Sequence, residues 1–162
     1  MIEIKELDDL NEQERVGLKL LLTEYGDFLC KELNFTVELD DYSSEMGKFP
    51  YRRYDKPEGN FLLALYDGMA AGCVGMKKLN DDSCEMKRMY VNPKFRGLKV
   101  GEKLCAEIIE RAKNIGYKKM VLDTNDVMKS AINLYLKFSF KETEAYCENK
   151  NPYPLFMYKL LE

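Results

Sequence analysis

Three strand-like runs joined by short turns lie in the middle of the chain, and they restrict the fold more than any other feature of the sequence. The first, residues 61–66 (FLLALY), is apolar throughout, and the Asp67-Gly68 pair that follows it is typical of a tight hairpin turn. The second run covers residues 69–79 and the third residues 84–91, with a polar turn between them. Consecutive strands joined in this way pair with their neighbours, so we expect an antiparallel meander.

The third run alternates in a way that assigns each side chain to one face of the sheet, because successive strand residues point to opposite faces. The even-numbered positions are expected on one face: Met86, Arg88 and Tyr90. The odd-numbered positions are expected on the other: Glu85, Lys87, Met89 and Val91. Glu85 would therefore share a face with the far end of its strand.

On both sides of the meander the sequence pattern switches between helix and strand. A strand at 2–7 precedes it, followed by one long helix or two helices in series at 12–33. Residues 34–60 are predicted to hold a short helix near 38–47 and an irregular loop. The segments predicted after the meander are helices at 100–115 and 127–138 and strands at 119–124, 140–143 and 155–160. We therefore predict an α+β fold, a single mixed and mostly antiparallel sheet flanked by helices, in one domain spanning residues 1–162.

Charge and composition argue against several classes of function. The chain has 25 basic and 28 acidic residues, a net charge of -3, which argues against a general nucleic-acid-binding protein. It has no histidine, so the commonest general base and metal ligand is missing, and we expect no metal site. The five cysteines are scattered without a C-x-x-C pair, as in a reducing compartment. Neither a signal peptide nor a membrane-length apolar run is visible, so we expect a cytoplasmic protein that binds no membrane.

The loop between the third strand and the next helix is the strongest candidate for a binding site. Residues 91–103 (VNPKFRGLKVGEK) leave a strand and open a helix, and the N–H groups at a helix N-terminus attract anions. Gly97 and Gly101 let the backbone approach a ligand closely, while Arg96 and Lys99 add positive charge. The loop suits a diphosphate, although it contains neither a P-loop nor a G-x-G-x-x-G motif. A basic connection without a ligand is the alternative interpretation.

Other residues are chemical candidates by type, and each has a structural alternative. Glu85 could be a general base in a cleft or a solvated charge on a strand. Tyr135 lies on the apolar stripe of the predicted helix at 127–138, where it could pack in the core or present a protonated phenol to a site. A set of tyrosines could line a substrate pocket or pack within loops: Tyr42, Tyr51, Tyr54, Tyr146 and Tyr153.

In this order the pieces resemble the GCN5-related N-acetyltransferase (GNAT) family. The matching stretches are EMKRMYV at 85–91, RGLKVG at 96–101, LDT at 122–124 and AINLYLKFSF at 131–140. The resemblance implies a GNAT-like acyl-CoA N-acyltransferase fold. It also implies that the chain transfers an acetyl group from acetyl-CoA to an amine by direct attack, without a covalent enzyme intermediate. The acceptor, a small molecule or a protein, is not identified by these motifs.

The resemblance further implies how acetyl-CoA is held. The backbone of Met89 and Val91, on either side of Tyr90, would hydrogen-bond the pantetheine arm as an added strand would. Arg96 and Gly97 would shape the turn. The pyrophosphate would accept hydrogen bonds from the amides of the next five residues: Leu98, Lys99, Val100, Gly101 and Glu102.

By the same resemblance, Tyr135 would protonate the thiolate of coenzyme A as it leaves. Glu85 falls at the strand position that serves as general base in members of the histone-acetyltransferase type, so it would deprotonate the acceptor amine.

The sequence departs from the family pattern at three positions. Lys99 stands where the motif has its first glycine, and we expect its side chain to point outward while backbone amides bind the pyrophosphate. Ser139 replaces the glycine before the terminal aromatic residue of the last motif, and Met128 stands where many members have an asparagine. Asn125 or Asn133 would then take over the missing pantetheine contact.

Two other classes of function stay open at this point. The first is a non-catalytic acyl-CoA-binding or regulatory module on the same fold, and the second is a nucleotide-binding protein that uses the same helix terminus. We expect the acceptor side to be formed by the loops at 42–54 and 146–158. The expected partners are acetyl-CoA and an amine acceptor, with no nucleic acid, and the protein would be a monomer or a homodimer.

Overall fold

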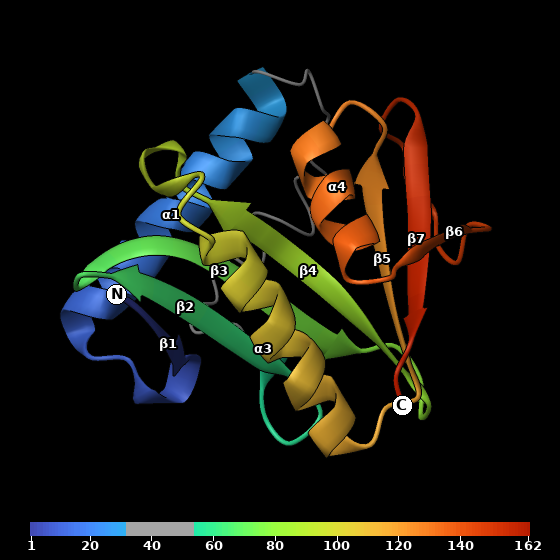
Figure 1. The fold of residues 1–162 in the computed structure, drawn as a ribbon, viewed down its shortest axis with the longest axis horizontal. Helices are drawn as coiled ribbons and strands as arrows, with labels where there is room; N and C mark the ends of the chain where they lie inside the picture. Colours follow the sequence, from blue (N-terminus) through green and yellow to red (C-terminus); the bar gives the residue numbers. More distant parts are fainter. Residues whose placement is uncertain (32–53) are drawn as a thin grey trace.

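The computed structural model describes residues 1–31 and 54–162, which form one open sheet with helices on both faces (Figure 1). The strands in chain order are β1 (Ile2–Glu6), β2 (Asn60–Tyr66), β3 (Met69–Lys78), β4 (Ser83–Val91), β5 (Lys119–Asn125), β6 (Lys141–Thr143) and β7 (Pro154–Leu160). The helices are α1 (Glu12–Lys31), α3 (Val100–Ile115) and α4 (Lys129–Lys137), with short 3-10 turns η1 (Leu7–Asp9) and η3 (Pro93–Phe95). The predicted α+β fold on one mixed sheet is confirmed. The helix predicted near 38–47, together with Tyr42 and Tyr51, lies outside the described residues.

The seven strands are ordered β1-β2-β3-β4-β5-β7-β6. All neighbouring strands are antiparallel except β4 and β5, which run parallel, so the predicted meander of β2, β3 and β4 is confirmed. The β4–β5 ladder is very short and joins only residues 83–85 to residues 119–121. Beyond it the two strands diverge, as Figure 1 shows, and their facing backbone groups have no ladder partner across the gap. The sheet therefore opens in its middle.

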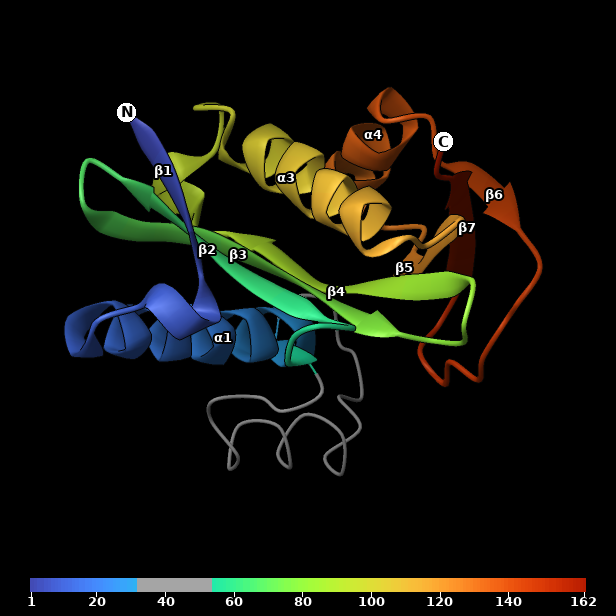
Figure 2. The same ribbon diagram turned by 90° about the horizontal axis from the view of Figure 1, so that it is seen from below.

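The two faces of the sheet carry separate cores. α1 covers one face, while α3 and α4 cover the other (Figure 2). In β2, Leu62 packs into the cluster on the α3 side and Leu63 into the cluster on the α1 side, as strand alternation requires. Leu104 and Ile108, one helical turn apart on α3, are fully buried against the sheet. Burial of each such side chain contributes about 1.5–3 kcal/mol, which holds α3 against the sheet.

A β-bulge in β4 reverses the faces predicted for the second half of this strand. Near its middle the register advances by one residue more in β4 than in β3, and Arg88 takes a φ of 60°. Met86 and Val91 consequently both pack on the α3 side, whereas Tyr90 packs on the α1 side. The prediction that Met86 shares a face with Tyr90, and Glu85 with Val91, is wrong, because one extra residue inverts the alternation.

Within residues 1–31 and 54–162, no helix combines the length and the apolar character that crossing a membrane requires.

Candidate active site

The loop before α3 is folded so that the helix begins with exposed amides. The Asn92 side chain accepts a hydrogen bond from the Lys94 amide (2.9 Å) and starts η3. Gly97 and Lys99 then have φ angles of 80° and 68°, which turn the chain into the helix. A Cβ built on Gly97 would meet no atom within 4 Å, so a side chain would fit there. Glycine is favoured at this position because it adopts the left-handed backbone conformation without strain. The first amides of an α-helix have no acceptor within the helix, so those of α3 are able to bind an anion.

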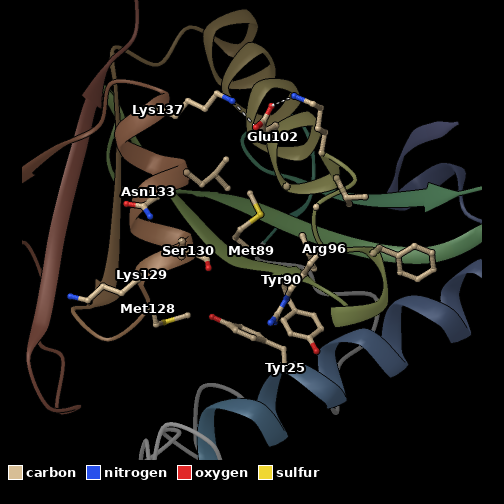
Figure 3. Close-up of a pocket in the computed structure, with 18 of the residues that line it drawn as sticks. Tyr25, Met89, Tyr90, Arg96, Glu102, Met128, Lys129, Ser130, Asn133 and Lys137 are labelled. Carbon is tan, nitrogen blue, oxygen red and sulfur yellow. Dashed lines mark hydrogen bonds and ion pairs between the residues drawn. The ribbon is translucent and has the colours of Figure 1, made fainter.

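A cavity of about 650 Å³ adjoins this helix N-terminus (Figure 3). Nine of the residues predicted to bind the cofactor line it: Met89, Tyr90, Val91, Arg96, Gly97, Lys99, Val100, Gly101 and Glu102. Leu98 does not line it, and its side chain is 41% exposed. Residues of α4, among them Ser130 and Asn133, form the opposite wall. The cavity therefore extends from the helix terminus to the opening between β4 and β5.

Basic and aromatic side chains that the sequence analysis did not single out also line this cavity. Lys137 of α4 donates to Glu102 of α3 (2.6 Å) and so links the two helices across the cavity. Lys129, two helical turns earlier on α4, lines it too. The Arg96 guanidinium lies 5.9 Å from the centre of the Phe28 ring of α1. The spacing of the two lysines on one predicted helix was the signal available in the sequence.

Lys99 fits the left-handed position where the family has glycine. Its side chain is 76% exposed, and its Nζ lies 3.8 Å from a Glu102 carboxylate oxygen. The side chain thus extends along the surface, outside the backbone turn that faces the cavity.

A second cavity of about 150 Å³ lies where β4 and β5 diverge, and it shares Tyr25, Met89 and Met128 with the larger one. Tyr135 lines it from α4, with 6% of its surface exposed and its ring 5.8 Å from that of Phe140. No hydrogen bond joins its hydroxyl to any residue in the described part of the chain. Burial raises the pKa of Tyr135 well above its ordinary value, so the phenol is a protonated donor at neutral pH.

Glu85 lines neither of the two cavities. It is 5% exposed, and the Tyr146 hydroxyl donates to its Oε2 (2.5 Å). The ammonium groups of Lys77 and Lys87 lie 3.6 Å and 3.8 Å from its oxygens. Burial, followed by the charge of Glu85, raises the pKa of Tyr146, which therefore stays a donor. Lys87 lines the second cavity, so it is the side chain that connects Glu85 to it.

Asp123 of β5 also lines the second cavity, and the sequence analysis missed it. Its side chain is 17% exposed, and its Oδ1 lies 3.7 Å from Nζ of Lys87. Its Oδ2 accepts a hydrogen bond from the Asn149 side chain (3.1 Å). In the sequence, Asp123 was noted only as part of the LDT stretch that matches the family. Nothing in its local sequence indicates that Asn149, 26 positions further on, would donate a hydrogen bond to its carboxylate.

The remaining candidates from the sequence divide into packing and lining residues. Tyr54 is 2% exposed and packs edge-on against Phe61 (4.9 Å between ring centres), so it belongs to the α1-side core. Tyr153 is 71% exposed. Asn125 is 2% exposed, accepts from the Val127 amide (3.1 Å) and donates to the carbonyl of Pro152, so its polar atoms serve the turn after β5. Asn133, in contrast, lines the large cavity.

Within residues 1–31 and 54–162, no three or more cysteine, aspartate and glutamate side chains come together as a group that could hold a metal ion.

Comparisons with known proteins agree with this arrangement. Residues 27–140 match the model of the acetyltransferase (GNAT) family. An uncharacterized N-acetyltransferase from Schizosaccharomyces pombe is 39% identical, over 93% of this chain and 89% of the relative. The fold is similar to that of a GNAT-family acetyltransferase from Staphylococcus aureus, with a TM-score of 0.79, 24% identity and full coverage of both chains. It is also similar to a putative acetyltransferase from Salmonella typhimurium solved with acetyl-CoA, with a TM-score of 0.74, 16% identity and coverage of 99% and 94%.

Proposed function

The chain belongs to the GNAT acetyltransferase family, and on this basis we propose that it transfers the acetyl group of acetyl-CoA to the nitrogen of an amine by direct attack on the thioester. The observation that carries the proposal is the adjacency of the two cavities, which share Tyr25, Met89 and Met128. One runs from the helix N-terminus to the open sheet, and the other holds the Tyr135 phenol at the end of that path.

The large cavity supplies what acetyl-CoA requires. The amides at the start of α3 and the Arg96 side chain suit the pyrophosphate. The pantetheine arm would extend along β4, where the strand has no partner toward β5 and the backbone of Met89 and Val91 can pair with it. Asn133 is the remaining candidate for the contact that an asparagine makes at the position of Met128 in many members of the family.

The reaction that we propose has one bond-making and one bond-breaking step at the same carbon. The amine nitrogen bonds to the thioester carbonyl carbon, and the carbon–sulfur bond then breaks. The sulfur leaves as a thiolate and takes a proton from the Tyr135 hydroxyl. The proton released by the amine passes to Glu85, by way of water because the carboxylate does not line the cavity.

The departures from the family motif at Lys99 and Met128 are the features that would favour the non-catalytic alternative. The Lys99 side chain is exposed and does not close the cavity, so Lys99 gives no reason to prefer a non-catalytic protein. The enzyme is therefore the function that the site supports best.

The proposed function predicts release of free coenzyme A thiol from acetyl-CoA when an acceptor amine is present. We expect turnover with at least one member of a panel of small primary amines and lysine-containing peptides, measured with a thiol reagent. Release without amine should be slow. A protein that binds acetyl-CoA and turns over none of the panel would contradict the proposal.

Lys99→Gly is expected to leave the Kd for acetyl-CoA within about two-fold, because an exposed side chain paired to Glu102 contributes little. Since a non-glycine residue at a left-handed position costs about 1–2 kcal/mol, the free energy of unfolding should stay level or rise by up to about 1 kcal/mol. Calorimetry and denaturant titration measure the two quantities.

The matched control is Lys113→Gly in the last turn of the same helix, where glycine should lower stability by about 1 kcal/mol. A loss of affinity of about ten-fold or more in Lys99→Gly would instead identify the Lys99 side chain as a phosphate ligand.

A further inference from the structure

The smaller cavity passes through the sheet, and its two ends differ in character. Toward α3 and α4 it is lined by apolar side chains and by Tyr135. On the other side, toward α1, its lining includes polar groups from β5 and from the segment between β6 and β7. If acetyl-CoA enters along the large cavity, the acceptor has to approach from this polar end.

Two side-chain oxygens at the polar end accept no hydrogen bond from any residue in the described part of the chain. One is Oδ1 of Asn151, but it is fully buried, so a ligand in the cavity cannot touch it while the side chain keeps this position. The other is Oδ1 of Asp123, whose contact with the Lys87 ammonium, at 3.7 Å, is too long for a hydrogen bond. The Asp123 side chain lines the cavity and is 17% exposed, so its Oδ1 is open to a ligand that brings N–H groups.

The structure around Asp123 holds this arrangement in place without the ligand. The Asn149 side chain donates to the other oxygen of Asp123 (3.1 Å). The Asn151 amide donates to the Asn149 side-chain oxygen (2.9 Å), which ties the two asparagines to each other. The same segment is fixed to β4 through the hydrogen bond from Tyr146 to Glu85. The three residues thus form a connected polar wall beside the Tyr135 phenol.

We propose that Asp123 forms the acceptor site, and that its Oδ1 binds the N–H groups of an unhindered primary alkylammonium, the end of an aminoalkyl chain. This inference rests on the proposed function. Lys87 and Arg88 line the same cavity and offset the negative charge of Asp123, so recognition depends on hydrogen bonds to the nitrogen more than on net charge. The volume of about 150 Å³ admits a slender chain and excludes an amine flanked by bulky groups.

The test measures amine binding separately from acetyl transfer. Wild-type protein is saturated with coenzyme A, which cannot react, and is titrated with ethyl-, butyl- and hexylammonium in a calorimeter. Each titration is repeated with the N,N,N-trimethyl derivative, which keeps the charge but has no N–H. We expect at least one primary ammonium to bind. Its trimethyl derivative should have a Kd at least about ten-fold higher.

Asp123→Asn should weaken binding of the same ammonium about ten-fold or more, with an unchanged Kd for acetyl-CoA as the sign that the fold is intact. Asp126→Asn is the matched control, because Asp126 is exposed in the turn after β5 and lines neither cavity. It should bind both ligands as the wild type does.

The outcomes separate this inference from the proposed function. No binding of any primary ammonium, equal binding of the trimethyl derivatives, or an Asp123→Asn variant with unchanged affinity would each overturn the site. If the enzyme turns over an amine and Asp123→Asn does not change the KM for that amine, the acetyltransferase activity is supported and the acceptor site is contradicted. Asp123-dependent binding without thiol release would support the site and contradict the transfer reaction.

Discussion

Replacing Tyr135 with phenylalanine is expected to lower kcat on the order of 100-fold while the Kd for acetyl-CoA stays within about two-fold. The phenol lines the cavity between β4 and β5, and no described residue hydrogen-bonds its hydroxyl, so the substitution leaves no protein group unpaired. The fold should therefore survive. Steady-state thiol release and calorimetry give the two numbers.

The size of this effect follows from the dry surroundings of the leaving sulfur. Burial raises the pKa of Cys105, a thiol in the same α3-side core, to about 12. A coenzyme A thiolate expelled into such surroundings is likewise a strong base and takes a proton readily. Water can replace the phenol only slowly there, so the loss falls on kcat.

The control is Tyr117→Phe, since Tyr117 is also buried in this core but donates to the backbone of Glu58 (2.6 Å) and lines neither cavity. It should cost stability and leave kcat unchanged. An unaltered kcat in Tyr135→Phe would show that Tyr135 is only a packed aromatic residue.

The direction of the Tyr135 shift also fixes the pH range in which the acid works. Burial raises its pKa from the ordinary 10.0, so the protonated, proton-donating form persists beyond pH 10. The wild-type profile of kcat should accordingly show no loss from this group between pH 7 and about pH 10. A decline with a midpoint near pH 8 would assign the acid to another residue.

The sequence predicted the parts of the fold that depend on neighbouring residues. The Asp67-Gly68 turn and the apolar periodicity of residues 100–115 are local signals, and β2, β3 and α3 follow from them. The conformation of the loop that we propose to bind the pyrophosphate was predictable for the same reason, because the two glycines and the helix start lie within a few residues.

Features that depend on tertiary structure could not be predicted in this way. The bulge at Arg88 has no glycine to mark it, and it inverted the faces assigned to β4. The opening of the sheet depends on where the β4–β5 ladder stops, which no residue type encodes. The role proposed for Asp123 depends on Asn149, which donates a hydrogen bond to it, and on Asn151, which lines the same cavity. Both asparagines lie in the segment between β6 and β7, far from Asp123 in the sequence.

Glu85→Gln is expected to lower kcat on the order of 100-fold at neutral pH, with little change in KM for the amine. Asp123→Asn should act mainly on KM, so the two carboxylates are separated by the parameter that each one changes. If Glu85 takes the proton of the amine, the deficit of the variant must shrink as pH rises toward the pKa of the amine, about 10.4 for a lysine-like nitrogen, because the amine then arrives deprotonated. Thiol release measured from pH 7 to pH 10 gives this profile.

The structural role of Glu85 has to be separated from its chemical one, since the carboxylate also holds Tyr146. Tyr146→Phe removes that hydrogen bond and keeps the carboxylate, so it should cost less than about ten-fold in kcat and show no recovery at high pH. Glu142→Gln on β6, which is exposed, serves as the neutral control for the change of charge. Equal losses in Glu85→Gln and Tyr146→Phe, both independent of pH, would mean that Glu85 anchors the segment between β6 and β7. The proton of the amine would then have to leave by another route, and Asp123 is the carboxylate that already lines the cavity.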